Sequence, residues 1–202
     1  MVKGIIDTLK KDKVVAVIRT NSYEEAKEIS IGAIEGGVKV IEVTMSVPNS
    51  EKLIKELKET YTNILVGAGT VLTKDQLNLC IENKADFIVS PCLSEDVIME
   101  SKNCNILVIP GVMTMSELNS AYSKGIRFFK VFPGNVVGKD FIKAAKSIFC
   151  DIDIMPTGGV NNENMLEWIE AGADCIGIGS DLNKAFKNFG KNGVTKYFEK
   201  IV

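Results

Sequence analysis

The sequence predicts a single α/β domain folded as a compact (β/α)8 barrel, the TIM-barrel architecture, with a short N-terminal helix. Two observations carry this prediction. Strand-like runs alternate with amphipathic helical stretches along the whole chain, and eight such runs recur at roughly 20–25-residue intervals. This alternation gives parallel strands joined by right-handed crossovers. An open doubly wound sheet is the alternative. No linker rich in Gly, Ser or Pro interrupts residues 1–202, so we expect one domain.

The strand-like runs are rich in β-branched and aromatic residues, and turn-forming residues bound them. The helical stretches between them open on Ser, Thr or Asn caps, and two of them end at Gly125 and Gly172. The first residues, MVKGIIDTLKKDK, have the pattern of a short amphipathic helix. The eight predicted strands are VVAVIR (14–19), VKVIEVTM (38–45), NILVGAGT (63–70), DFIVSP (86–91), NILVIPGV (105–112), IRFFKVFP (126–133), DIDIMPTGG (151–159) and DCIGIGS (174–180).

The composition argues against several classes of partner. The 202 residues are 46% hydrophobic and 25% charged, with a net charge of −2, which gives no basic footprint for nucleic acid or a membrane surface. No apolar run approaches the roughly 18–20 residues that span a bilayer. The five cysteines share no CxxC spacing and are expected to be reduced. We therefore expect a cytoplasmic protein that binds neither nucleic acid nor a membrane.

Two residue counts restrict the chemistry. The sequence has no histidine, which excludes His-based acid–base catalysis, Ser-His-Asp triads and His-ligated metals, so we expect no metal and no cofactor. Its 24 basic residues include only two arginines, Arg19 and Arg127. Because only arginine offers a planar fork of donors, geometry is one explanation for these two positions. Compositional bias explains the scarcity of arginine but not where it occurs.

Strand alternation predicts which polar side chains point into the barrel near the carboxyl ends of the strands, where such folds place their chemistry. Lys130 lies in the apolar run IRFFKVFP. Glu42 and Thr44 alternate with apolar residues that suit the helix-facing side. Thr70 ends the run that contains GAGT, and Arg19 ends the first run. The expected inward set is therefore one lysine, one glutamate, one arginine and threonine hydroxyls.

An amine and a carboxylate in a dry interior suit Schiff-base chemistry. Removal from water disfavours an ammonium ion, and a free amine attacks a ketone to give an iminium that acts as an electron sink. A carboxylate can move the protons that these steps require. The same pattern also fits a structural ion pair between Lys130 and Glu42, or a lysine that extends to the edge of the barrel.

Two glycine-rich turns follow the last two predicted strands. PTGGV supplies Gly158 and Gly159, and GIGS supplies Gly179 and Ser180. Their backbone N–H groups are expected at helix N-termini, and barrels often bind phosphate between these two loops. Glycines also serve tight turns, so each motif alone is a weak signal. Together they favour a phosphate site, which a non-catalytic phosphometabolite-binding barrel would share.

The motifs VIRT, IEVTM, VGAGTVLT, IVSP, IPGVMT, FKVFPGN and MPTGGV, in this order and spacing, resemble the 2-keto-3-deoxy-6-phosphogluconate (KDPG) aldolase family. That family also includes 4-hydroxy-2-oxoglutarate (KHG) aldolases. The resemblance implies a class I aldolase that cleaves a 2-keto-3-deoxy sugar acid phosphate to pyruvate and glyceraldehyde 3-phosphate. An epimeric galactonate-derived substrate or 4-hydroxy-2-oxoglutarate would use the same kind of site. The resemblance also implies a homotrimer.

The resemblance implies roles for individual residues. Lys130 matches the Schiff-base lysine and Glu42 the acid–base glutamate. One position departs from the family pattern, because many relatives carry an arginine shortly after EVT, where this chain has Ser46. Arg19 could supply the missing fork, or could pair with Glu42. The other matches are a carboxylate contact at Thr70, pyruvate-pocket residues Pro91 and Phe132, and the phosphate end Gly158, Gly159, Gly179 and Ser180.

Overall fold

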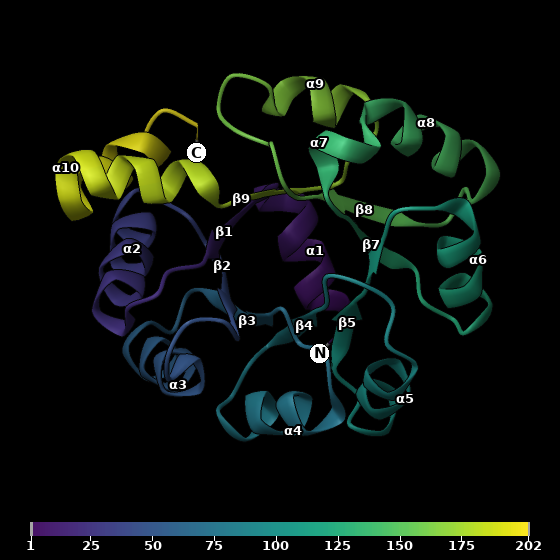
Figure 1. The fold of residues 1–202 in the computed structure, drawn as a ribbon, viewed down its shortest axis with the longest axis horizontal. Helices are drawn as coiled ribbons and strands as arrows, with labels where there is room; N and C mark the ends of the chain where they lie inside the picture. The colour runs from purple at the N-terminus through teal and green to yellow at the C-terminus, as the bar shows by residue number, and fades with distance from the viewer. Residues whose placement is uncertain (1, 202) are drawn as a thin grey trace.

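The computed structural model describes residues 2–201, in which short strands alternate with helices along the chain (Figure 1). Each predicted strand run contains a strand. The N-terminal helix is present as predicted. In chain order the elements are α1 (Val2–Asp12), β1 (Val14–Ile18), α2 (Tyr23–Glu35), β2 (Val40–Thr44), α3 (Ser50–Thr60), β3 (Leu65–Gly69), α4 (Lys74–Glu82), β4 (Phe87–Val89), α5 (Glu95–Asn103), β5 (Leu107–Ile109), β6 (Gly111–Val112), α6 (Met115–Ser123), β7 (Phe128–Val131), α7 (Gly134–Val137), α8 (Lys139–Ile148), β8 (Asp153–Pro156), α9 (Met165–Glu170), β9 (Ile176–Ile178) and α10 (Ser180–Phe198).

The helix ends follow the capping residues in the sequence. The side chains of Ser22, Ser94 and Thr114 each accept a hydrogen bond from the backbone N–H three residues later, which satisfies a donor that the helix leaves free. Gly125 and Gly172 adopt φ values of 84° and 106° just past α6 and α9. Side chains rarely adopt this left-handed conformation, so glycine terminates both helices cleanly.

The strands form two parallel sheets in the described residues. Six strands follow the order β5-β4-β3-β2-β1-β9, and a second sheet contains β6, β7 and β8. The last strand pairs with the first, β9 with β1, which is a cyclic neighbour relation. In a doubly wound sheet the chain would instead resume beside β1 with its next strand, so that alternative is wrong. One isolated parallel bridge, from Thr157 to Gly177, joins the two sheets.

The predicted strand 105–112 divides into β5 and β6 at Pro110. Proline has no backbone N–H and cannot donate to a ladder, so the run cannot continue as one strand. β5 pairs with β4, whereas β6 pairs with β7, so the division coincides with the change of sheet. The strand pairing thus establishes a curled parallel sheet with helices outside it. It does not show a fully closed eight-stranded barrel, which was the prediction.

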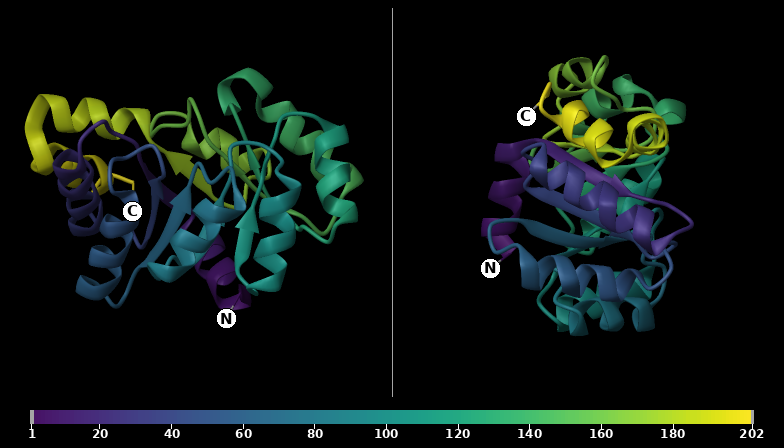
Figure 2. Two further views of the ribbon diagram at one scale, coloured as in Figure 1. Left: turned by 60° about the horizontal axis from the view of Figure 1, so that its bottom comes forward. Right: turned by 90° about the vertical axis from the view of Figure 1, so that its left-hand side faces the viewer.

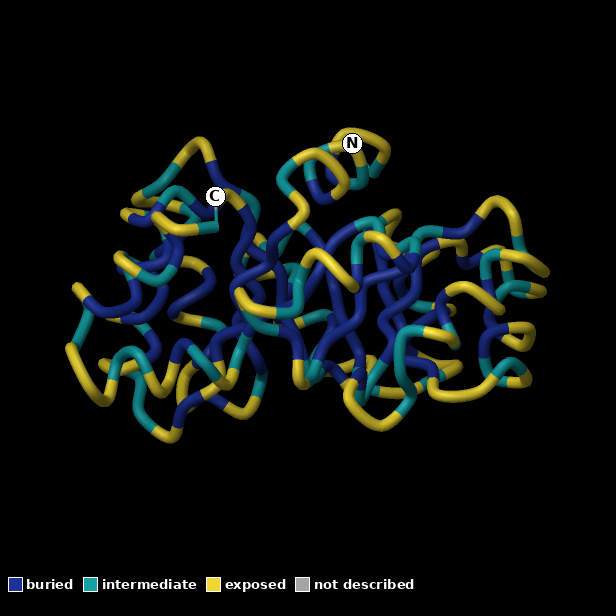
Figure 3. The backbone as a smooth tube through the Cα atoms, turned by 90° about the horizontal axis from the view of Figure 1, so that it is seen from above, coloured by how far each residue is buried: buried dark blue, intermediate teal, exposed yellow. Residues whose placement is uncertain are grey.

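Alternation sorts the strand side chains into two clusters. In β2, Val40 belongs to an inner cluster, whereas Ile41 and Val43 belong to the larger cluster beneath the helices. Within β2 this agrees with the predicted alternation, but Val38, which precedes the strand, belongs to the larger cluster and not to the predicted inward face. Strand residues are buried almost throughout, whereas the outer helices and loops carry both buried and exposed residues (Figure 3). The inner cluster therefore forms the floor on which an interior site can be built.

Helix α1 covers one end of the inner cluster (Figures 1 and 2). Ile5 and Leu9 pack into that cluster, and Lys10 forms an ion pair with Asp153 at the start of β8. Because β8 begins at Asp153, α1 lies at the amino ends of the strands. The carboxyl ends remain open for the site. No helix within residues 2–201 is long and apolar enough to cross a membrane.

Candidate active site

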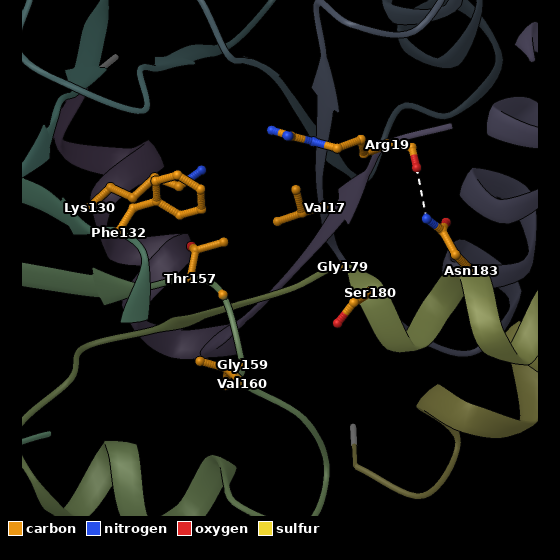
Figure 4. A pocket seen from close by; sticks show the side chains of 11 residues that line it. Val17, Arg19, Lys130, Phe132, Thr157, Gly159, Val160, Gly179, Ser180 and Asn183 are labelled. Atoms are coloured by element: carbon orange, nitrogen blue, oxygen red, sulfur yellow. Dashed lines mark hydrogen bonds between the residues drawn. The ribbon is translucent and has the colours of Figure 1, made fainter. Parts of the chain in front are cut away.

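A cavity of about 240 Å³ lies at the carboxyl ends of β1, β7, β8 and β9 (Figure 4). Lys130 and Phe132 line it from β7 and the segment after it. Arg19 faces them from the segment after β1, and glycine-rich segments close the remaining side. The complete lining is Val17, Arg19, Lys130, Phe132, Thr157, Gly158, Gly159, Val160, Gly179, Ser180 and Asn183. Seven of the eleven predicted site residues are in this set.

Lys130 and Glu42 meet inside the fold. Lys130 Nζ donates to Glu42 Oε1 at 3.1 Å, although the two residues are 88 positions apart in the sequence. Their side chains are 4% and 0% exposed. Glu42 comes from β2 of the six-stranded sheet and Lys130 from β7 of the second sheet, so the contact crosses the interior. At this depth little water competes for the polar atoms of the two side chains, which strengthens the hydrogen bond between them.

The Glu42 carboxylate keeps unused hydrogen-bonding capacity. Its Oε2 is buried and has no partner in the described residues. A buried acceptor without a partner is costly, and such groups concentrate at functional sites. The adjacent strand β3 leaves room for the carboxylate, because a Cβ added to Gly69 would lie 2.1 Å from Glu42 Oε1. Gly69, the second glycine of GAGT, therefore leaves the space that the Glu42 carboxylate occupies.

Arg19 reaches across the mouth of the cavity to the end of β3. Its Nη2 donates to Thr70 Oγ1 at 2.9 Å, and it forms no ion pair with Glu42 within residues 2–201. Thr70 has φ of 59°, an uncommon conformation for a β-branched residue that costs about 1–3 kcal/mol. The guanidinium is thus held near Lys130 with most of its donors free. A planar fork of this kind suits a carboxylate ligand.

The two glycine-rich turns differ in their relation to the helices. Gly179 is the N-cap of α10 and Ser180 is its first residue, as expected. Gly158 and Gly159 lie in a loop, and the helix that follows begins only at Met165. The prediction that both turns sit at helix N-termini is therefore wrong for the first. Gly158 and Gly159 have φ of 93° and 76°, so they line the cavity as a left-handed loop.

Three other predicted residues occupy different surroundings. Phe132 lies beside the lysine, with its ring centroid 5.5 Å from Lys130 Nζ. Thr44 is fully buried outside the cavity lining, and its hydroxyl donates to the Ile18 carbonyl at 2.9 Å and also contacts Ser46. Pro91 lies just after β4, also outside the cavity lining. Their roles toward a substrate stay predictions.

Sequence reasoning missed four lining residues, Val17, Thr157, Val160 and Asn183. The Thr157 hydroxyl is buried and has no hydrogen-bond partner in the described part of the chain. Thr157 continues the alternation that places Met155 in the inner cluster, so strand parity could have found it. Asn183 lies in the first turn of α10, where no strand pattern points to it. The cavity therefore offers more polar groups than the motifs alone reveal.

Similarity to known proteins identifies the family of this chain. The model of the KDPG and KHG aldolase family matches residues 5–196 of this chain. The chain belongs to the KDPG and KHG aldolase family. It is accordingly an aldolase, a lyase that acts on carbon–carbon bonds, and the predicted resemblance is confirmed.

Curated members of the aldolase family carry different substrate names. The 2-dehydro-3-deoxy-6-phosphogalactonate aldolase of Escherichia coli K12 is 32% identical over 173 residues, covering 85% of this chain and 84% of that one. The KHG/KDPG aldolase of the same strain is 33% identical over 159 residues, covering 77% and 74%. The KDPG aldolase structure from Legionella pneumophila, with pyruvate captured as a covalent carbinolamine, is 30% identical, with a TM-score of 0.88 over 97% of each chain.

Proposed function

We propose that this aldolase cleaves 2-keto-3-deoxy-6-phosphogluconate to pyruvate and glyceraldehyde 3-phosphate through a Schiff base on Lys130. One observation carries the proposal: a buried lysine, hydrogen-bonded to a buried glutamate, faces a cavity that also contains an arginine fork and glycine-rich loops. The covalent pyruvate carbinolamine in the Legionella relative supports the same chemistry.

In the proposed reaction Lys130 Nζ attacks the keto carbon of the substrate, and the resulting carbinolamine loses water to give an iminium. A base removes the proton of the hydroxyl next to the bond that breaks. The electron pair of that carbon–carbon bond passes to the iminium, so the aldehyde leaves and an enamine remains. Protonation of the enamine and hydrolysis then release pyruvate and the free amine. Glu42 is within 3.1 Å of Lys130 Nζ and carries these protons.

Other groups in and around the cavity bind the two ends of the substrate. Arg19 and Thr70 take the carboxylate beside the keto group, and Arg19 replaces the arginine that many relatives carry near Ser46. Phe132, with Pro91 nearby, bounds the pyruvate half, and Thr44 keeps the end of β1 in place through Ile18. The unpartnered Thr157 hydroxyl supports a contact with a substrate hydroxyl. The phosphate end comprises Gly158, Gly159, Gly179 and Ser180.

The substrate assignment has two close competitors, 2-keto-3-deoxy-6-phosphogalactonate and 4-hydroxy-2-oxoglutarate. The two E. coli relatives named above differ by one percentage point in identity, which does not choose between these substrates. The glycine-rich end of the cavity favours a phosphorylated substrate over 4-hydroxy-2-oxoglutarate. The gluconate-derived acid is our choice between the two epimers.

A panel of 2-keto acids, coupled to pyruvate detection, tests this choice. We expect the highest kcat/KM with 2-keto-3-deoxy-6-phosphogluconate, a lower value with its galactonate epimer, and the lowest with 4-hydroxy-2-oxoglutarate. EDTA should leave the rate unchanged, because no step uses a metal. A protein that binds sugar phosphates without releasing pyruvate would instead support the non-catalytic alternative, and inactivation by EDTA would support a metal-dependent barrel.

We also propose that the two sheets form one closed (β/α)8 barrel in a single domain of residues 1–202. The Thr157–Gly177 bridge and the Lys130–Glu42 contact support this, since both link the two sheets. A cytoplasmic location stays a prediction.

The proposed homotrimer has a direct test. The related chain in a cage built from fused symmetric oligomeric domains is 28% identical. Light scattering coupled to size-exclusion chromatography should give about three times the 22.0 kDa chain mass. A mass of one chain across the micromolar range would contradict the trimer.

Substituting Gly69 with alanine should lower kcat by about 100-fold, because a displacement near 1 Å of a catalytic group costs about that much. The new Cβ would overlap Glu42 Oε1 and force the carboxylate away from Lys130. Gly67→Ala in the same strand is the matched control, since its Cβ would meet the ring of Phe87 instead. That variant should lose stability by about 1–3 kcal/mol with a smaller change in kcat. Equal kcat in the two variants would contradict the role given to Gly69.

A further inference from the structure

The end of strand β1 is held by side chains on both of its flanks. Two successive backbone carbonyls accept these bonds. Thr44 Oγ1, from β2, donates to the Ile18 carbonyl at 2.9 Å. Asn183 Nδ2, from the first turn of α10, donates to the Arg19 carbonyl at 2.8 Å (Figure 4). Only the NH2 side of the amide can donate to a carbonyl, so this contact fixes the orientation of the Asn183 side chain. The segment leading to Arg19 is thereby tied to two different elements.

The Asn183 hydrogen bond extends the connection between β1 and the β9–α10 segment past the point where strand pairing ends. The ladder between β1 and β9 ends at the pair Ala16–Ile178. The next contact is steric, because a Cβ added to Gly179 would lie 3.2 Å from the Val17 carbonyl oxygen. Beyond that point Asn183 supplies the hydrogen bond that joins β1 to the start of α10. The first turn of α10 is thus attached to β1 by a side chain and not by strand pairing.

This attachment lies in the wall of the candidate active site. Asn183 lines the cavity together with Arg19 and Ser180 (Figure 4). Its amide bonds the main chain of Arg19, while the guanidinium of Arg19 bonds Thr70 at the end of β3. The backbone N–H groups of Gly179 and Ser180 belong to the same turn as Asn183. Any shift of that turn therefore moves Gly179 and Ser180 relative to Arg19 and Lys130.

We propose that Asn183 is a positioning residue that ties the first turn of α10 to the end of β1. It thereby sets the distance between the phosphate end of the cavity and the Lys130 centre. This inference rests on the proposed function, in which Gly179 and Ser180 hold the phosphate of the substrate. A substrate joined to Lys130 at one end and to the α10 turn at the other requires a defined separation between them. A keto acid without phosphate makes no such demand.

The test compares substrates with and without phosphate in the Asn183→Leu variant. Leucine has the same branching and the same number of heavy side-chain atoms as asparagine but cannot donate a hydrogen bond. We expect KM for 2-keto-3-deoxy-6-phosphogluconate to rise about tenfold, the usual cost of losing one positioning hydrogen bond. The kinetics with unphosphorylated 2-keto-3-deoxygluconate should change by less than about twofold, and inorganic phosphate should become a weaker competitive inhibitor. Asn183→Gln, which keeps an amide donor, should lose less than the leucine variant.

Asn192→Leu is the matched control, because Asn192 lies in the same helix, α10, but lines a different surface cavity around Phe189. It should leave both substrates and phosphate inhibition unchanged. An equal loss with phosphorylated and unphosphorylated substrates in Asn183→Leu, or no loss with either, would overturn the inference. If the wild-type enzyme showed no preference for the phosphorylated substrate, the proposed function would fail first, and the inference with it.

Discussion

Replacing Lys130 with methionine should abolish aldol cleavage, with a fall in kcat of at least about 10⁴-fold. Methionine retains an unbranched side chain of similar reach but lacks the amine that forms the iminium, so no covalent route remains. The Lys130 side chain is only 4% exposed, and methionine is no longer than lysine, so it occupies the same space. Pyruvate release from 2-keto-3-deoxy-6-phosphogluconate, measured with a coupled assay, gives the result.

The substitution also leaves Glu42 as a buried carboxylate without its partner. Breaking a buried pair costs about 3–5 kcal/mol, so thermal unfolding must be measured beside activity. Lys58→Met is a matched control, because Lys58 bonds Asp86 at the amino end of β4 and does not line the active-site cavity. It should lose stability without losing turnover. Appreciable cleavage by a folded Lys130→Met protein would show that another group carries the reaction.

Replacing Glu42 with glutamine should lower kcat by about 10²–10⁴-fold, the usual contribution of a positioned acid–base group. Glutamine keeps the shape of the side chain and can still accept a hydrogen bond from Lys130 Nζ. It cannot take up and return protons. The Lys130 amine, which forms the covalent adduct, remains in this variant. Pyruvate should therefore still be trapped on Lys130 by borohydride, although more slowly. The paired measurement separates loss of proton transfer from loss of the site.

Glu59→Gln is the control for this second variant, since Glu59 pairs with Lys84 at the surface and is far more exposed than Glu42. It should leave kcat unchanged. If Glu42→Gln retained kcat within about threefold of the wild type, proton transfer would have to be assigned elsewhere. The unpartnered Glu42 Oε2 would then need a structural explanation.

Strand parity predicted the central pair because the pattern is local while its consequence is global. Lys130 and Glu42 each interrupt an apolar run on the inward face, and parallel strands around one interior bring such positions together. Their meeting could be predicted from strand alternation although 88 positions separate them in the sequence. The inward face of β2 was predicted for the same reason, since Val40 and Ile41 belong to different clusters.

The rest depends on features that no periodicity encodes. The sequence shows only a proline, Pro110, within a predicted strand. That β5 and β6 on its two sides pair in different sheets depends on tertiary packing. Asn183 acts by donating to the Arg19 carbonyl, and this contact exists only because α10 packs beside the end of β1. The left-handed conformation of Thr70 and the loop from Gly159 to the start of α9 at Met165 have no signature in the hydrophobic pattern of the sequence. These are the sites where local propensity yields to function.

The central claim, a Schiff base on Lys130, is tested most directly by trapping it. Borohydride added in the presence of pyruvate reduces an iminium to a stable secondary amine. Peptide mapping by mass spectrometry then locates the modified residue. We predict one pyruvate-derived adduct per chain on Lys130, loss of activity in proportion to labelling, and no labelling of Lys130→Met. An adduct on a different lysine, or full activity in a protein that borohydride and pyruvate leave unmodified, would contradict the account.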